Sequence, residues 1–158
     1  MNTTYVGFKG KNNASCILAK ALYKEPILLT NSYNGLKRDI DSLSGEYDRV
    51  LMFGVDKTLT DSIRIEKSAE RYGLRLYTVI DYNDIINSVN KYNIKSRSAD
   101  NPTRYLCNDA YWQLLNKFSG RALLIHIPTV KYFNDELLCE LQKAIKSVFQ
   151  SVEENNPQ

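Results

Sequence analysis

Short apolar runs of strand length alternate along this chain with segments whose apolar residues recur at helical spacing, and this alternation constrains the fold more than any other feature. The apolar, β-prone runs predict strands at 3–8, 27–30, 49–53, 62–69, 74–80, 93–98 and 121–127. The helical spacing predicts helices around 17–22, 36–43, 85–89, 104–118 and 134–152. Strands that alternate with helices pack in layers, so we expect an α/β fold: a three-layer α/β/α sandwich with a mostly parallel or mixed central sheet.

The length of the chain, 158 residues, fits one domain with a core of its own. No internal repeat or linker divides it, so we predict a single domain at 1–152 and a polar tail at 153–158. No apolar run approaches the roughly 18 residues of a membrane span. The first ten residues lack the basic and apolar stretches of a secretory signal. We therefore expect neither contact with a membrane nor secretion.

The charges and the cysteines narrow the classes of partner. Lys and Arg total 21 and Asp and Glu total 18, and the small excess is interspersed rather than gathered into the basic footprint of a nucleic-acid binder. Cys16, Cys107 and Cys139 are an odd number without the spacing of a zinc site or a disulfide framework. We expect free thiols in a cytoplasmic protein, no metal and no cofactor, with Cys16 and Cys139 as structural residues on apolar helix stripes.

Ligands of open α/β sheets bind beyond the carboxyl ends of strands, so strand ends and helix starts are the places to expect chemistry. The chain has no P-loop, no glycine-rich dinucleotide motif and no nucleophile elbow. Its one histidine, His126, lies at the end of the apolar strand 121–127, just before Pro128. His126 is either a core histidine with a satisfied hydrogen bond or a general base, because imidazole titrates near neutral pH.

Two further residues could complete a nucleophilic site with His126. Cys107 lies in the expected first turn of the helix 104–118, where amide groups and the helix dipole lower the pKa of a thiol. The alternative is a core cysteine, because apolar residues continue its side of the helix. Glu66 alternates with apolar residues in the strand 62–69, so its carboxylate either orients the imidazole or is exposed on the opposite face.

Three segments, in this order along the chain, resemble motifs of pyroglutamyl peptidase I, also called pyrrolidone-carboxylate peptidase. Residues 65–69 (IEKSA) are similar to its glutamate motif, with Lys67 in place of an arginine. Residues 105–111 (YLCNDAY) resemble its nucleophile motif, in which Cys-Asn precedes a helix, and 124–128 (LIHIP) resemble its histidine motif. More weakly, Gly7 and Phe8 resemble the start of its Gly-Phe-x-Pro-Phe-Gly-Gly loop.

The resemblance implies a cysteine peptidase on an α/β/α sandwich that removes an N-terminal pyroglutamyl residue from peptides. By motif, Cys107 would be the nucleophile, His126 would take the thiol proton and later protonate the leaving amine, and Glu66 would hold the imidazole. Backbone amides near the helix start would stabilise the oxyanion. The implied partner is a peptide or small amide substrate, and assembly into a homo-oligomer is left open.

The family's substrate pocket is matched less well than its three catalytic residues. The N-terminal loop lacks the second Phe and the paired glycines, so only Phe8 would contact the lactam ring. Val55 stands where the family has a glutamine, and Asn108 follows the nucleophile; with Phe8 these are the expected substrate contacts. Two functions are therefore open: a cysteine hydrolase of small acyl amides, and a degenerate, non-catalytic member that binds a ligand or a protein.

Overall fold

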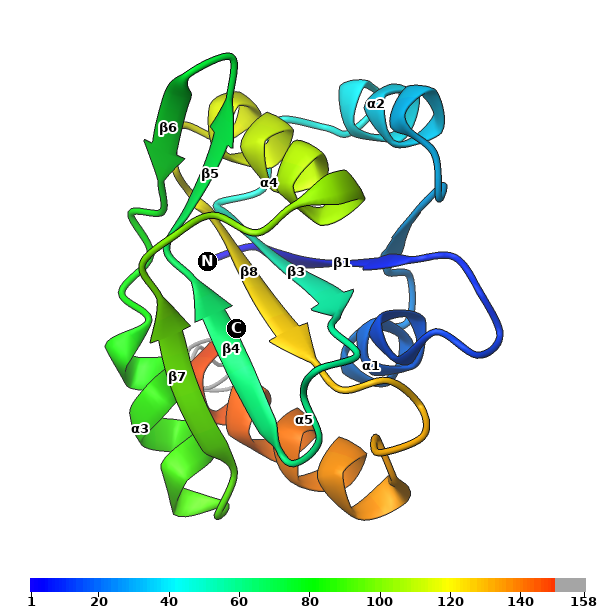
Figure 1. Ribbon diagram of the computed structural model, residues 1–158, viewed down its shortest axis with the longest axis vertical. Helices are drawn as coiled ribbons and strands as arrows, with labels where there is room; N and C mark the ends of the chain where they lie inside the picture. Colours follow the sequence, from blue (N-terminus) through cyan, green and yellow to red (C-terminus); the bar gives the residue numbers. More distant parts are fainter. Residues whose placement is uncertain (150–158) are drawn as a thin grey trace, which may run out of the picture.

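A six-stranded sheet forms the centre of the molecule. The computed structural model describes residues 1–149, and the strands of this sheet are β1 (Thr3–Phe8), β2 (Ile27–Leu29), β3 (Arg49–Val55), β4 (Ser62–Glu66), β7 (Lys95–Ala99) and β8 (Ala122–Ile127). A separate two-stranded sheet holds β5 (Ser68–Arg71) and β6 (Leu74–Tyr77). The order across the main sheet is β2-β1-β3-β8-β4-β7, and β4 runs antiparallel to β8 whereas the other pairs are parallel (Figure 1). The sheet is therefore mixed.

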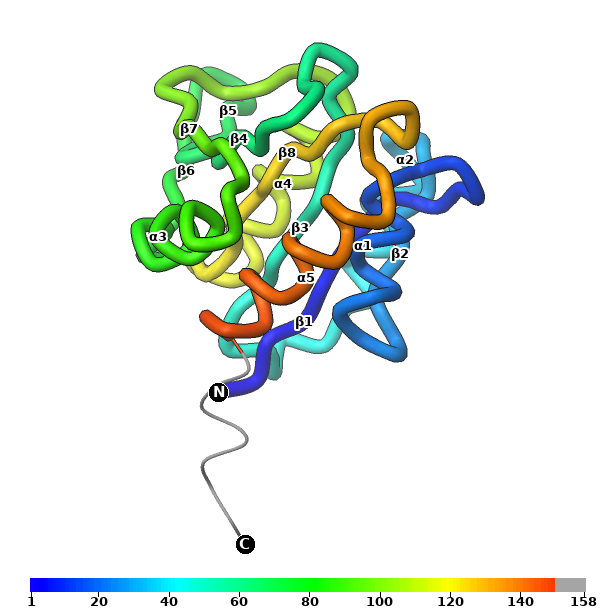
Figure 2. Tube along the Cα trace, turned by 90° about the horizontal axis from the view of Figure 1, so that it is seen from below, coloured from blue at the N-terminus to red at the C-terminus, as the bar shows by residue number. Residues whose placement is uncertain are grey.

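Helices cover both faces of this sheet, which gives the three-layer α/β/α sandwich predicted from the sequence. The helices among residues 1–149 are α1 (Ala14–Leu22), α2 (Tyr33–Asp41), α3 (Asn83–Lys91), α4 (Tyr105–Lys117) and α5 (Asp135–Phe149). On one face, α5 runs between α1 and α3 and contacts both, as Figure 2 shows from below. On the other face, α2 and α4 pack together.

The local sequence explains where the first two helices begin. Asn13 caps α1 by accepting a hydrogen bond from the amide of Ser15, and Ser32 caps α2 by accepting one from the amide of Gly35. Such caps satisfy amide groups that a helix start leaves without partners, and each contributes about 1 kcal/mol. Short polar side chains thus determine where these two helices begin.

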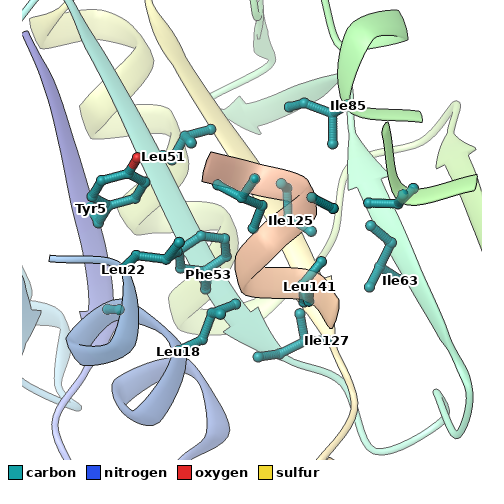
Figure 3. Packing of buried hydrophobic residues seen from close by; sticks show 14 of the residues in the cluster. Tyr5, Leu18, Leu22, Leu51, Phe53, Ile63, Ile85, Ile125, Ile127 and Leu141 are labelled. Carbon is teal, nitrogen blue, oxygen red and sulfur yellow. The ribbon is translucent and has the colours of Figure 1, made fainter. Parts of the chain in front are cut away.

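The central strand β8 is buried along its whole length, and its alternating side chains enter two cores. Leu123, Ile125 and Ile127 belong to the core beneath α1, α3 and α5, where Figure 3 shows Ile125 and Ile127. Leu124 belongs to the core against α2 and α4. Full burial of such a side chain contributes roughly 1.5–3 kcal/mol, so this pattern fixes the register of β8. By the same alternation, His126 faces the α4 side.

The segment 62–69 is two strands rather than the single strand predicted. β4 ends at Glu66, and β5 leaves the main sheet to pair antiparallel with β6. Tyr72 and Gly73 join β5 to β6, and both have positive φ, which is the backbone of the two-residue hairpin turn that suits twisted strands. Ala69 lies in the same alternation as Ile63 and Ile65, with Lys67 between them, so the pattern alone could not show where the chain leaves the sheet.

The other predicted elements agree with the structure within a few residues at their ends. β6 ends at Tyr77 rather than at residue 80, and β7 begins at Lys95 rather than at residue 93. The structure describes α5 to Phe149; residues 150–152 of the predicted domain and the predicted tail at 153–158 lie outside the described residues. Within the described part, no helix is both long enough and apolar enough to cross a membrane.

Candidate active site

The structure brings Cys107 and His126 together over Gly54. Gly54 lies opposite His126 in the parallel pairing of β3 with β8, and α4 carries Cys107 in its first turn. A Cβ atom on Gly54 would lie 2.8 Å from the Cys107 Sγ and 3.1 Å from the His126 Nε2. The sulfur and the nitrogen therefore cannot be farther apart than the sum of these two distances. The glycine leaves the space that both side chains occupy.

Glu66 lies on the other side of the imidazole. Its Oε1 is 2.7 Å from the His126 Nδ1, and the two side chains are almost fully buried. Burial raises the pKa of Glu66, but the hydrogen bonds from His126 and Arg64 outweigh burial and lower it below its usual value. The carboxylate is therefore charged at neutral pH and accepts a hydrogen bond from a protonated Nδ1. In the neutral imidazole this leaves Nε2 without a proton, on the Cys107 side.

Arg64 and Asp56 extend this pair into a network that the sequence did not reveal. The antiparallel register of β4 and β8 places Arg64 opposite His126. The Arg64 Nε donates to the same Glu66 oxygen at 2.7 Å, and a terminal guanidinium nitrogen donates to Asp56 at 2.7 Å. Burial raises the pKa of Asp56, but hydrogen bonds from Thr58 and Arg64 lower it to about 2. Glu66, Arg64 and Asp56 therefore all carry charge at neutral pH.

The thiol of Cys107 is neutral at pH 7, and the prediction of a lowered pKa at the helix start was wrong. Burial raises the pKa of Cys107, the Glu66 and Asp56 carboxylates raise it further, and Arg64 opposes them only in part, so that it reaches about 12. Cys107 does lie in the first turn of α4, as predicted, but it is packed against the sheet and close to two carboxylates. A thiolate at this position needs a base, and the His126 Nε2 lies across Gly54 from the sulfur, within the sum of the two distances above.

A pocket of about 470 Å³ lies next to Cys107 and His126, a volume that suits a small ligand. Its wall includes both of these residues and Val55, which was predicted as a substrate contact. The rest of the wall is formed by Asp56, Lys57, Thr58, Thr103, Arg104, Tyr105 and Leu106. The pocket thus joins the end of β3 to the start of α4, which is where the sheet and the helix bring the candidate nucleophile and base together.

The other two predicted contacts lie away from this pocket. Phe8 is 4% exposed and packs in the core with Val6, because alternation in β1 turns both residues to the same buried face. Asn108 follows Cys107, but its side chain pairs with the backbone of Glu70: Nδ2 donates to the carbonyl, and Oδ1 accepts from the amide. Asn108 therefore fastens α4 to β5. Neither residue lines the pocket beside Cys107.

The remaining cysteines take no part in this site. Cys16 is buried in α1, whereas Cys139 is exposed on α5, so the prediction of a structural Cys139 was wrong. Cys139 precedes the buried Leu141 by two residues, about 200° around the helix, and so lies on the opposite side of α5. Residues 1–149 contain no group of three or more His, Cys, Asp or Glu side chains that could hold a metal ion.

Solved structures share the fold of this chain, although no protein-family model and no curated protein matches its sequence. A mutant pyrrolidone carboxyl peptidase from Pyrococcus furiosus superposes with a TM-score of 0.78 at 16% identity, over 99% of this chain and 100% of that chain. The pyrrolidone carboxyl peptidase from Thermococcus litoralis superposes with a TM-score of 0.71 at 16% identity, over 99% of this chain and 97% of that chain. The resemblance predicted from the motifs is confirmed at the level of the fold.

Proposed function

We propose that this protein is a cysteine peptidase or amidohydrolase that removes an N-terminal pyroglutamyl or related small acyl group through Cys107, His126 and Glu66. The observation that carries the proposal is the approach of the Cys107 sulfur and the His126 Nε2 over Gly54, with Glu66 2.7 Å from Nδ1. A nucleophile, a base and a group that orients the base are what acyl transfer to sulfur needs. The fold shared with pyrrolidone carboxyl peptidases supports the same chemistry.

In this mechanism the thiol keeps its proton until the substrate binds, because the pKa of Cys107 is about 12. The His126 Nε2 accepts that proton as the sulfur attacks the acyl carbon, and Glu66 stabilises the imidazolium. Amide groups at the start of α4, which have no partner inside the helix, would stabilise the oxyanion. The imidazolium then gives its proton to the leaving amine. Water hydrolyses the thioester, which releases the acid and restores the thiol.

The pocket supports a small acyl group as the substrate's reacting end. Val55 and Leu106 supply apolar wall on which the methylene groups of a lactam ring could pack, and Lys57 and Arg104 add positive charge. Because Phe8 belongs to the core, recognition here would not use the aromatic loop that the resemblance implied. We propose a pyroglutamyl peptide as the first substrate and other small acyl amides as the second. A cytoplasmic location suits the free thiols of the chain.

A second candidate function is a non-catalytic module that binds a ligand or protein partner in the same pocket. The observation that favours it is the raised pKa of Cys107, because a thiol that keeps its proton to about pH 12 is a poor nucleophile without assistance. In this alternative, the buried charges of Glu66, Arg64 and Asp56 would only stabilise the fold. The two functions differ in whether His126 moves the thiol proton.

The experiment that tests the proposed function is hydrolysis of a fluorogenic pyroglutamyl amide, with acetyl, prolyl and alanyl amides of the same fluorophore beside it. The proposed function predicts that the fluorophore is released faster from the pyroglutamyl amide than from the prolyl and alanyl amides. The prolyl and alanyl groups carry a basic amine, which does not suit a site for a neutral acyl group. No release from any of the four amides, together with a ligand-induced rise in thermal stability, would favour the binding module.

Gly54→Ala is expected to lower kcat/KM for the hydrolysed amide by roughly 100-fold. The added Cβ would lie 2.8 Å from the Cys107 sulfur, so the sulfur or the imidazole must move, and displacement of a reacting group by about 1 Å costs about that factor. The matched control is Gly45→Ala, where a Cβ meets no atom within 4 Å, and its kcat/KM should stay unchanged. Equal rates for the two variants would contradict the placement of the reacting atoms over Gly54.

A further inference from the structure

Arg64 connects the charged groups of the candidate active site through a single guanidinium. Its Nε donates to the Glu66 oxygen that His126 also contacts, and its terminal nitrogen donates to Asp56. The same terminal nitrogen lies 3.3 Å from the His126 Nδ1. The Arg64 side chain is 15% exposed, so water screens these contacts less than it does on an open surface. One residue of β4 thus fixes the carboxylate and stands next to the imidazole.

Asp56 holds the other end of this guanidinium. Its Oδ1 accepts hydrogen bonds from the amide and the hydroxyl of Thr58, which leaves Oδ2 directed to Arg64. A planar guanidinium that is anchored at both ends has little freedom to rotate. The Glu66 carboxylate, which accepts a hydrogen bond from the Arg64 Nε, is therefore restrained against the Nδ1 of His126.

The charges around His126 oppose one another. The charged and titratable groups that face it or line its pocket are Glu66 and Arg64 from β4, Asp56 and Lys57 from the loop after β3, and Arg104, Tyr105 and Cys107 from the start of α4. The Glu66 and Asp56 carboxylates favour a charged imidazolium, whereas Arg64, the cation nearest to Nδ1, disfavours it. Without Arg64, the Glu66 and Asp56 carboxylates would be opposed only by Lys57 and Arg104 in the wall of the pocket, and by no cation at Nδ1 itself.

We propose that Arg64 is a positioning residue: anchored by Asp56, it holds the Glu66 carboxylate against Nδ1 and keeps the resting His126 imidazole uncharged. An imidazole that is already protonated cannot take the thiol proton, so this restraint would keep the base ready. The effect of Arg64 on catalysis rests on the proposed function. Its effect on the charge of the imidazole does not, and it can be measured in a protein with no activity.

The single histidine of the chain allows a direct test, because its ring signals report one titration in an NMR spectrum. In Arg64→Gln the midpoint of that titration is expected to move to higher pH by on the order of one unit, since a neighbouring positive charge is lost. In Asp56→Asn it is expected to move to lower pH, since Arg64 then acts without its balancing carboxylate. Arg38→Gln, on the exposed side of α2, removes the same charge and should leave the midpoint unchanged.

Shifts of opposite sign separate the proposed role from a merely structural one. If Arg64 and Asp56 only stabilised the fold, both replacements would loosen the site and move the midpoint in the same direction, and that result or two unchanged midpoints would overturn the proposal. Arg64→Lys keeps the charge and loses the forked geometry of the guanidinium, so it should restore most of the original midpoint. The Asp56→Asn and Arg64→Lys measurements also decide the question if Arg64→Gln does not fold.

Hydrolysis rates distinguish failure of this inference from failure of the proposed function. In an active protein, the acid limb of kcat/KM should move with the NMR midpoint of each variant. Shifted midpoints in a protein that hydrolyses none of the amides would remove the proposed function and leave the electrostatic role of Arg64 standing. Normal hydrolysis with midpoints that do not shift would remove the role of Arg64 and leave the proposed function standing.

Discussion

Replacing Cys107 with alanine is expected to lower the hydrolysis rate of a pyroglutamyl amide by about four to six orders of magnitude, because the acyl group then has no nucleophile to receive it. The fold should persist, since Cys107 is only partly buried and loss of its sulfur costs about 1 kcal/mol. The measurements are kcat at saturating substrate and kcat/KM at limiting substrate, with thermal unfolding of the same preparation. An unchanged unfolding transition then assigns the lost rate to chemistry.

Further variants test whether the lost rate is specific to the Cys107 sulfur. Cys139→Ala removes an exposed thiol from α5 and should leave kcat/KM unchanged, which makes it the matched control. His126→Ala should lose about as much rate as Cys107→Ala, and the double variant should lose little more, because groups that act in one proton transfer are not additive. A Cys107→Ala protein that keeps a tenth or more of its activity would show that the sulfur does not attack the substrate.

Replacing Glu66 with alanine is expected to lower the free energy of unfolding by about 3–5 kcal/mol at pH 7, since it removes the acceptor of two charge-assisted hydrogen bonds, from His126 and from the largely buried Arg64, which then keeps only Asp56. It also removes the acceptor that orients His126, so hydrolysis should fall as well. Denaturant unfolding followed by circular dichroism measures the first effect. Glu66→Gln keeps the side-chain volume and one acceptor oxygen, so it should lose less stability.

The stability lost in Glu66→Ala should become smaller as the pH falls. Folding lowers the pKa of Glu66 below its ordinary value of 4.5, so the stability it contributes is present above that value and is lost as the pH falls through the folded-state pKa. The difference between the unchanged protein and Glu66→Ala should therefore narrow in acid.

The control for Glu66 is Glu70→Ala. Glu70 is a half-exposed carboxylate whose partner Arg75 is 3.8 Å away, and its replacement should cost less than about 0.5 kcal/mol. Equal losses for the two variants would contradict the buried network around Glu66.

The sequence predicted those features of the fold that depend on neighbouring residues. The apolar run at 121–127 predicted the strand that the structure shows buried along its length, and the helical spacing predicted the helix at 104–118 within one residue at each end. Alternation in β4 placed Glu66 on the face opposite Ile63 and Ile65. In the structure, the face with Glu66 is the one that packs against α4. Periodicity therefore predicted which face of a strand or helix each side chain lies on. The motifs then suggested which of these side chains lie in one site.

Contacts between different elements that no motif marks were not predicted. The antiparallel pairing of β4 with β8 places Arg64 opposite His126, and no local pattern shows which strands pair. The contact of Arg64 with Asp56 joins a strand to a loop eight residues earlier, and neither residue has an unusual neighbour in the sequence. The predicted direction of the Cys107 pKa was wrong for the same reason, because burial, which raises this pKa most, and the two carboxylates that raise it further come from other elements.

Mass spectrometry of protein quenched in acid during turnover of a pyroglutamyl ester tests the central claim most directly, because an ester acylates the enzyme faster than an amide does. The account predicts one pyroglutamyl group bound as a thioester to the tryptic peptide that contains Cys107, with none on Cys16 or Cys139. The modification should disappear in Cys107→Ala and form more slowly in His126→Ala. Turnover of the ester with Cys107 unmodified at every time point would contradict the account.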